Sequence, residues 1–222
     1  GKRVGVVDTD IQSPGIHVLF GLGEERISHA LNDYLWGECE IEQTAYDVTA
    51  NLGGDLPGKA YLIPASIRAG EIARVLREGY DVSLLNDGFH ALIDRLGLDV
   101  LVIDTHPGLN EETLLSIAVS DALAVVLRPD QQDYQGTGVT VEVARKLGVP
   151  RMVLVINKVP AVFDPADVRL RVEEAYRADV AAVLPQSDEL MALASAGVFS
   201  LRYPEHPLTA EFERIADQLT AV

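Results

Sequence analysis

Cysteine is nearly absent from this sequence, since Cys39 is the only one in 222 residues. A single thiol excludes an internal disulfide framework, and it also excludes a cysteine-rich zinc or iron–sulfur site built within one chain. Long hydrophobic runs are missing too, because no apolar segment approaches the ~18–20 residues of a membrane span. With 48% hydrophobic and 23% charged residues, the composition indicates an ordinary globular protein, and we expect a cytoplasmic setting.

Basic residues are also scarce. Eighteen Lys and Arg stand against 34 Asp and Glu, which gives a formal net charge of −16. Because nucleic-acid binding gains much of its affinity by neutralising phosphates, this balance does not favour DNA as a partner. The histidines lack the i, i+4 spacing of a zinc-binding helix, and we expect each to be a surface or core residue. They are His17, His29, His90, His106 and His206.

An apolar run that ends at an acid stands near the middle of the sequence. The four residues from Val100 to Ile103 are followed by Asp104 and then by a Pro107-Gly108 turn. A run without polar alternation predicts a parallel strand buried on both faces. Asp104 would then lie at the carboxyl end of the strand, in the Walker B arrangement that holds Mg²⁺. Capping of the next helix is the structural alternative for this residue.

A second apolar run ends in acids near the start of the sequence. Val4 to Val7 leads directly into Asp8 and Asp10. Side chains two residues apart on an extended backbone point to the same side, so we expect both carboxylates near Asp104 at one edge of a sheet. Such convergence favours a metal–phosphate site over unrelated caps.

Strand and helix patterns alternate through the rest of the sequence. This alternation predicts one α/β domain with right-handed crossovers and a mostly parallel sheet covered by helices on both faces. A loop is expected over 51–58, which contains three glycines and a proline. Further strands are expected at 61–63, 122–127, 152–156 and 180–184. Helices are expected at about 28–36, with Ser28 as the cap, and at 71–78, 84–96, 165–177 and 209–219. Three more are expected: one begins after the cap Asn110, one follows the polar run Gln131 to Gly138 and ends at residue 147, and one ends at residue 196.

Taken in order, these strand ends resemble the MinD/ParA family of deviant P-loop ATPases over nearly the whole chain. The resemblance implies a three-layer, P-loop NTPase-like fold that binds ATP and Mg²⁺ and hydrolyses ATP. The segments that carry it are Gly1 to Val4 with Asp8-Thr9-Asp10, Tyr61-Leu62-Ile63-Pro64-Ala65-Ser66, Asp104-Thr105-His106-Pro107-Gly108, Asn157-Lys158, Leu184-Pro185-Gln186 and Tyr203 to Thr209.

The resemblance also implies roles at the triphosphate end of the site. Asp10 would orient the water that attacks the γ-phosphate, with capping of the turn at Ser13 as its structural alternative. Asp8 would lie behind the ligands of Mg²⁺, and Asp104 would hold the water shell of the ion. Gly108 would offer its backbone N–H to the γ-phosphate, unless it is a simple turn glycine. His106 lies in the same loop, but nothing in the sequence orients it, and we expect it to be incidental.

For the base, the resemblance implies a pocket made by Asn157 with Lys158 and by Pro185 with Gln186. Asn157 would read the amino edge of adenine through its side-chain amide. A strand-end Asn is also common as a turn residue.

One element of the family is missing from these 222 residues. No K-G-G-x-G-K-S/T pattern occurs, although the family begins with a strand, that phosphate loop and a helix. We expect a strand–helix unit on the order of 30 residues to precede Gly1 in the intact protein. A sheet without this strand should expose apolar surface and unpaired edges. Phosphoryl transfer needs the lysines of the loop, so these residues alone should be nearly inactive.

The resemblance implies an ATP-dependent homodimer that positions division, partition or flagellar machinery through a protein activator or cargo. One alternative is an ATP-dependent synthetase of the cobyrinic acid or dethiobiotin type on the same scaffold. Another is a nucleotide-free scaffold or binding module. Membrane attachment is not expected, because the last residues, Asp217 to Val222, form no basic amphipathic helix.

Overall fold

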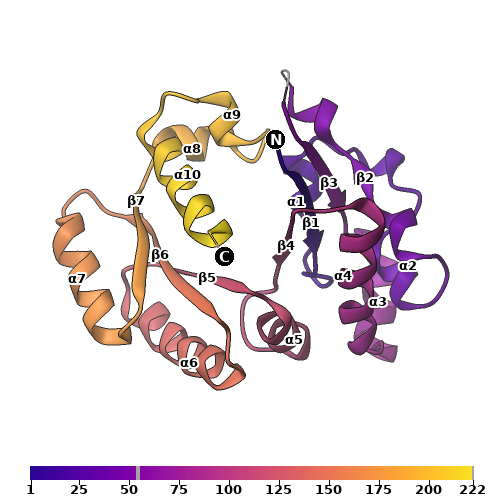
Figure 1. Ribbon diagram of the computed structural model, residues 1–222, viewed down its shortest axis with the longest axis horizontal. Coiled ribbons are helices and arrows are strands. Elements are labelled where there is room, and N and C mark those ends of the chain that lie inside the picture. The colour runs from indigo at the N-terminus through magenta and orange to yellow at the C-terminus, as the bar shows by residue number, and fades with distance from the viewer. Residues whose placement is uncertain (54–55, 222) are drawn as a thin grey trace. The chain divides into compact units, whose positions relative to one another are not determined.

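The computed structural model describes residues 1–53 and 56–221, which form two compact units (Figure 1). Unit 1 comprises Gly1–Ser116 and Ser195–Val198, and unit 2 comprises Ile117–Ala194 and Phe199–Val222. Gly54, Asp55 and Val222 lie outside the described residues, and with them part of the loop predicted over 51–58 and the last residue of the predicted non-basic tail. Each unit contains its own sheet.

The sheet of unit 1 has the strand order β2-β3-β1-β4. Strand β1 (Arg3–Asp8) pairs in parallel with β3 (Lys59–Ile63) on one side and with β4 (Val100–Asp104) on the other. The short strand β2 (Tyr46–Asp47) pairs with β3 in the antiparallel sense. The predicted strands are therefore present, and the sheet is mostly parallel.

Both faces of this sheet are covered, because successive residues of β1 point to opposite sides. Val7 packs in a cluster with Leu31 of α2 and Phe89 of α4, whereas Val6 packs with Leu22 and other residues on the opposite face. The helices that begin in unit 1 are α1 (Ile16–Leu19), α2 (Leu31–Leu35), α3 (Ala69–Glu78), α4 (Ser83–Leu96) and α5 (Glu111–Val119), with 3₁₀ turns at Glu24–Arg26, Ile41–Thr44 and Thr49–Leu52.

The predicted cap at Ser28 is wrong. Helix α2 begins three residues later, at Leu31, and the N–H of Ala30 donates to Oδ2 of Asp33 over 2.7 Å. Ser28 instead donates its backbone N–H to the Tyr46 hydroxyl over 2.8 Å, with its own Oγ 3.2 Å from the same atom. The Tyr46 hydroxyl, 18 residues along the chain, thus binds Ser28, which the local spacing had assigned to the N-terminus of the helix.

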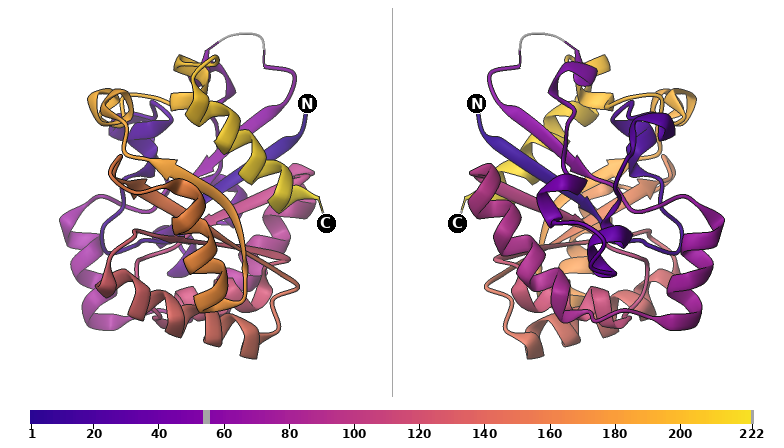
Figure 2. Two further views of the ribbon diagram at one scale, coloured as in Figure 1. Left: turned by 90° about the vertical axis from the view of Figure 1, so that its left-hand side faces the viewer. Right: turned by 90° about the vertical axis from the view of Figure 1, so that its right-hand side faces the viewer.

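Unit 2 contains the parallel sheet β5-β6-β7, made of Ala122–Leu127, Arg151–Val159 and Asp179–Pro185. Leu154 and Ile156 pack beneath α6 (Gln131–Leu147) and α7 (Pro165–Tyr176), while Val153 and Val155 face α9 (Phe199–Arg202) and α10 (Pro207–Thr220). Figure 1 shows α7 and α10 on opposite sides of β7, and Figure 2 shows α10, in yellow, running across the strands of this unit. Each sheet thus forms the middle of three layers.

Three bounds in unit 2 differ by more than two residues from the predicted ones. Helix α6 begins at Gln131, so the polar run predicted ahead of this helix is part of it. Strand β6 runs on to Val159 instead of ending at Ile156, with a shift of register against β7 between those residues. Helix α8 (Asp188–Leu193) stops short of the predicted end at residue 196, because Ala194 adopts a left-handed conformation with φ of 47°. Within the described chain, every helix is too short or too polar to cross a bilayer.

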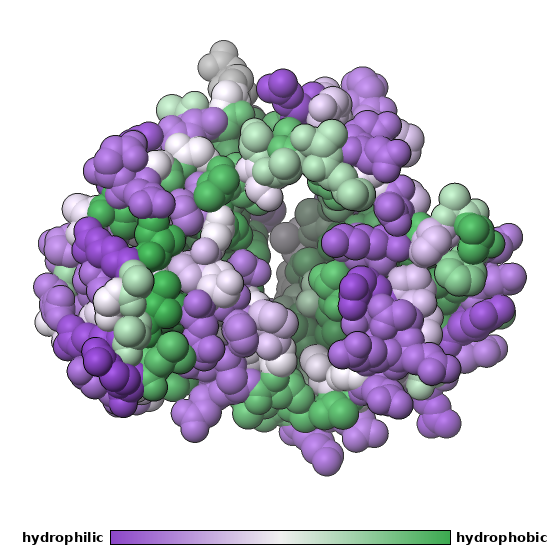
Figure 3. Space-filling view, turned by 180° about the vertical axis from the view of Figure 1, so that it is seen from behind, coloured by the Kyte–Doolittle hydropathy of each residue, from purple (hydrophilic) through white to green (hydrophobic). Residues whose placement is uncertain are grey.

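Strands β4 and β5 each form an open edge of their sheet. Among the described residues, β4 pairs with β1 alone and β5 with β6 alone. Val102 of β4 is 47% exposed and Val126 of β5 is 61% exposed. The prediction that Val100 to Ile103 is buried on both faces is therefore wrong, because an edge strand has a neighbour on one side only. Apolar residues reach the surface of both units, as the green areas of Figure 3 show.

Candidate functional site

The acids that end β1 and β4 lie at one edge of the unit 1 sheet. Asp8 is the register partner of Asp104 across the parallel pair. Thr9, the next residue, donates its backbone N–H and its Oγ1 to the carbonyl oxygen of Asp104, over 2.9 and 2.7 Å. The convergence predicted from the two apolar runs is confirmed.

Asp8 is a buried carboxylate with 1% exposure. Its Oδ1 accepts the N–H of Asp10 over 3.1 Å, and its Oδ2 accepts the N–H of Gly15 over 3.2 Å. Burial raises the pKa of Asp8 to about 6, and the negative charge of Asp104 adds to the rise, while the two backbone N–H groups lower it in part. With both oxygens already engaged, Asp8 is suited to a place behind a metal ligand.

Asp10 lies in the turn after β1 and makes two contacts through Oδ1. One is with the backbone N–H of Ser13, over 3.0 Å, which is the turn cap considered as the structural alternative. The other is with Nδ1 of His106, over 2.8 Å. The expectation that nothing orients His106 is therefore wrong. The available signal was its place two residues beyond Asp104, in the loop after the strand that pairs with β1.

The loop after β4 is fixed where it enters α5. Asn110 accepts the N–H of Thr113 on Oδ1 over 2.8 Å, which confirms the predicted cap, and Oγ1 of Thr113 donates to the carbonyl oxygen of His106 over 3.3 Å. Gly108 has φ of +110°, which favours glycine, although a Cβ there would meet no atom within 4 Å. Its predicted contact with a γ-phosphate stays a prediction.

The donor set at this edge suits magnesium held together with phosphate. Asp104 keeps much of its surface exposed, and its partial burial, with the charge of Asp10, raises its pKa. Searching the residues that the structure describes, we find no group of three or more His, Cys, Asp or Glu that could hold a metal. Mg²⁺ commonly takes one or two carboxylates together with waters and phosphate oxygens. Burial is the main cause of the raised pKa values of Asp8 and Asp104, and neighbouring negative charge adds to both. A cation beside Asp104 would offset that negative charge.

The predicted base-binding residues lie at the ends of β6 and β7 in unit 2. Asn157 accepts the N–H of Lys158 on Oδ1 over 2.8 Å, and Lys158 has a left-handed backbone with φ of 55°. The N–H of Gln186 donates to the carbonyl oxygen of Val159 over 3.0 Å, which ties the chain after β7 to the end of β6. An irregular strand end of this kind re-aims side chains and is frequent beside functional sites.

A cavity of about 620 Å³ opens beside these strand ends, a volume typical of small-molecule pockets. Pro185 and Gln186 line it, whereas Asn157 and Lys158 do not. The structure thus brings two of the four predicted residues into one hollow. The other lining residues are Pro160, Ala161, Val183, Ser187, Asp188, Glu189, His206, Pro207, Leu208 and Glu211.

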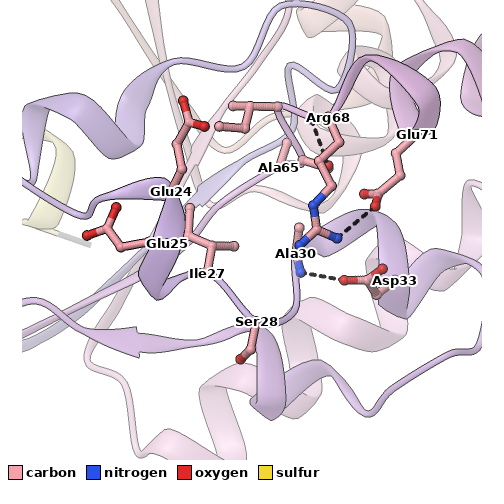
Figure 4. Close-up of a pocket in the computed structure, with 11 residues that line it drawn as sticks. Glu24, Glu25, Ile27, Ser28, Ala30, Asp33, Ala65, Arg68 and Glu71 are labelled. Carbon is pink, nitrogen blue, oxygen red and sulfur yellow. Dashed lines mark hydrogen bonds and ion pairs between the residues drawn. The ribbon is translucent and has the colours of Figure 1, made fainter.

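A second cavity, of about 480 Å³, lies in unit 1 and contains none of the predicted site residues. Its lining is acidic, with Glu24, Glu25, Asp33 and Glu71 against one cation, Arg68. Figure 4 shows the Arg68 guanidinium extending toward Glu71, to which it is paired over 2.9 Å. Two separate segments, residues 24–33 and 65–71, build this cavity, so no local motif predicts it.

Two curated relatives match nearly the whole chain, and both are described as uncharacterized ATP-binding proteins of Methanocaldococcus jannaschii. One is 25% identical over 220 residues, covering 99% of this chain and 76% of the relative. The other is 24% identical over 226 residues, covering 100% of this chain and 78% of the relative. No family model matches the chain.

Solved structures show which fold this is. The cell division protein MinD of Aquifex aeolicus superimposes with a TM-score of 0.79 at 16% identity, over 100% of this chain and 86% of that one. The MinD of Pyrococcus horikoshii, complexed with Mg-ADP, scores 0.77 at 17% identity, over 98% and 83%. Cobyrinic acid a,c-diamide synthase of Mycobacterium smegmatis, with an ATP analog and magnesium, scores 0.66 at 21% identity, over 88% and 80%. The chain has the fold of MinD/ParA-type P-loop ATPases, as its strand ends predict.

Proposed function

We propose that this chain is part of a MinD/ParA-like ATPase that binds Mg-ATP, hydrolyses it and acts as a molecular switch. The observation that carries the proposal is the meeting of Asp8, Asp10 and Asp104 where β1 and β4 end. Two ATP-binding relatives along nearly the whole chain support a nucleotide as ligand.

At the triphosphate end, each acid has a task that suits its surroundings. Mg²⁺, when bound, would neutralise charge on the phosphates. Asp104, the more exposed acid, would hold the water shell of the ion. The buried carboxylate of Asp8 would hold Asp10 in place by accepting the backbone N–H of Asp10. Asp10 would align the attacking water by accepting a hydrogen bond from it. Gly108 would donate its N–H to the terminal phosphate from a position that can move with the loop.

At the base end, the cavity lined by Pro185 and Gln186 is proposed to take adenine. Asn157 and Lys158 lie outside the lining of this cavity, near the irregular end of β6. From there the side-chain amide of Asn157 would bind the amino edge of a base that extends beyond the cavity, and Lys158 would flank the base. The cavity offers apolar walls such as Val183 and Leu208 to a base, together with polar side chains such as Gln186 and Glu189.

Hydrolysis also needs charge that these residues do not supply. Phosphate-loop lysines neutralise the phosphates in P-loop enzymes, and no matching pattern occurs in the 222 residues. The experiments below therefore use the full-length protein, and we expect residues 1–222 alone to be nearly inactive. We further propose ATP-dependent homodimerisation, a protein activator or cargo, and a role in the cytoplasm positioning cellular machinery.

A synthetase is the second candidate, because a cobyrinic acid a,c-diamide synthase shares this fold. The two candidates differ in what accepts the phosphoryl group. A switch ATPase releases phosphate from ATP and water alone, whereas a synthetase releases it only when a carboxylic acid substrate is present.

The test is phosphate release by the full-length protein with Mg-ATP as the sole substrate, compared with its Asp104→Asn variant. Loss of one charged group from such a site typically costs about 10²- to 10³-fold in turnover. Asp94→Asn is the matched control, since Asp94 is an exposed acid on α4. Turnover retained by Asp104→Asn would refute the assigned site, and a full-length protein that binds no ATP would favour the scaffold interpretation.

A further inference from the structure

A side-chain contact joins two loops of the candidate site. Nδ1 of His106, in the loop after β4, lies 2.8 Å from Oδ1 of Asp10, in the turn after β1. A carboxylate only accepts hydrogen bonds, so Nδ1 carries the proton in this contact. The distance falls in the range of charge-assisted hydrogen bonds, which are about twice as strong as neutral ones.

Both partners are partly shielded from water. The side chain of Asp10 is 17% exposed and that of His106 is 31% exposed. Competition from solvent is therefore weaker than at the surface ion pairs of this chain, such as Lys59–Asp47 with 49% and 41% exposure.

Each partner is also anchored on its own side. Asp10 is held by the Ser13 N–H on its carboxylate and by its own N–H on Asp8. His106 is held through its carbonyl oxygen by Thr113, in the first turn of α5. The Asp10–His106 hydrogen bond thus links two segments that are otherwise fixed separately.

We propose that His106 is a positioning residue, whose Nδ1–H holds the carboxylate of Asp10 so that its other oxygen faces the attacking water. This inference rests on the proposed ATPase function. The same hydrogen bond would make the orientation of Asp10 depend on where the 105–110 loop lies. Gly108 belongs to that loop, so a contact between its N–H and the terminal phosphate would be transmitted to Asp10. Hydrolysis would then proceed only when the loop after β4 is in the position seen here.

The test compares three substitutions in the full-length protein. His106→Ala removes the donor. His106→Asn places an amide N–H close to the position of Nδ1, whereas His106→Gln places it near that of Nε2. His90→Ala is the matched control, because His90 is exposed on α4 and contacts only the carbonyl oxygen of Asn86 in its own helix among the described residues.

Single-turnover phosphate release and ATP affinity are measured together. A misplaced catalytic group typically costs up to about 100-fold, so we expect His106→Ala to slow hydrolysis by about 10- to 100-fold with ATP affinity nearly unchanged. His106→Asn should recover most of the rate and His106→Gln should not. Equal rates for His106→Ala and wild type, or equal failure of Asn and Gln, would overturn the inference.

Hydrogen exchange gives a readout that does not depend on activity. If the contact links the loops, His106→Ala raises exchange of residues 10–15 as well as of 105–110. A wild-type protein without turnover whose exchange responds in this way would refute the ATPase proposal while leaving the link between the loops intact. Unchanged exchange in residues 10–15 would overturn the link whatever the activity.

Discussion

The two units end their parallel strands in different chemistry. In unit 1, β1 and β4 end in three carboxylates, two of them with raised pKa values, and polar contacts bind the tips together. In unit 2, Asn157 lies near the end of β6, and Pro185 and Gln186 lie at the end of β7. Pro185 and Gln186 line a cavity of about 620 Å³. The backbone arrangement is the same, since in both sheets the candidate site residues lie at or just after the carboxyl ends of parallel strands.

The difference teaches what each end is suited to bind. A buried acid such as Asp8 beside other acids is costly unless a cation is present, so the unit 1 edge is organised for charge. The unit 2 hollow combines apolar walls, such as Pro185 and Leu208, with polar side chains that include Asp188, Glu189 and Glu211. A concave site of this mixed lining suits a ligand that fills it, so the unit 2 edge is organised for shape. The predictions below test this contrast.

The largest expected effect comes from the two cores. Leu62 of β3 and Leu154 of β6 are both fully buried, one in each unit. Replacing either with Ala should lower the free energy of unfolding by about 2–5 kcal/mol. Hydrogen exchange should show the loss mainly in the unit that carries the substitution. Val139→Ala, at a residue 55% exposed on α6, is the control, and equal loss of protection in both units would show that they unfold as one.

A smaller effect is expected from the proton on Asp8. Its pKa is about 6 in the folded chain and 3.8 as the ordinary value. The folded state therefore holds this proton more tightly, and the associated stability is complete below pH 4 and is lost as pH rises through 6. The change is at most about 3 kcal/mol. We expect the free energy of unfolding of wild type, minus that of Asp8→Asn, to fall between pH 4 and pH 7 in chemical denaturation.

The matched measurement uses Asp94→Asn, which changes an exposed acid and should give a flat difference across the same pH range. A flat difference for Asp8→Asn as well would show that Asp8 is not destabilised by burial. The contrast between an edge organised for charge and one organised for shape would then be lost.

The smallest effect is expected at the cavity of unit 2. Ala161 is an exposed lining residue, so Ala161→Trp should fill part of the hollow without disturbing the core. We expect the affinity of the full-length protein for ATP to fall about tenfold, which corresponds to about 1.4 kcal/mol, in calorimetry. Val162→Trp is the control, because Val162 is 84% exposed and does not line the cavity. Unchanged affinity in Ala161→Trp would place the base elsewhere.

Much of the fold could be predicted from local sequence, because the deciding groups are close along the chain. The apolar runs before Asp8 and Asp104 predict their strands, and parallel pairing then brings the acids together. Asn110 caps its helix as predicted, because its side chain reaches the N–H of Thr113, three residues ahead.

The remaining features depend on partners far along the chain. His106 contacts a residue 96 positions away, and only the register of β1 against β4 brings the two together. Ser28 loses its predicted role to the Tyr46 hydroxyl. The exposure of Val102 depends on what lies beside its strand, which the strand's own residues do not encode. Single-domain organisation stays a prediction.

The open edges of β4 and β5 have a consequence for how these residues behave in solution. Each edge leaves a row of backbone donors and acceptors beside an exposed valine, which is a template for pairing with a strand of another molecule. The net charge of −16 opposes such association, because like-charged copies repel one another. Added salt screens this repulsion over distances of about 10 Å at 0.1 M. The colloidal stability of residues 1–222 should therefore depend on ionic strength, with precipitation favoured as salt rises.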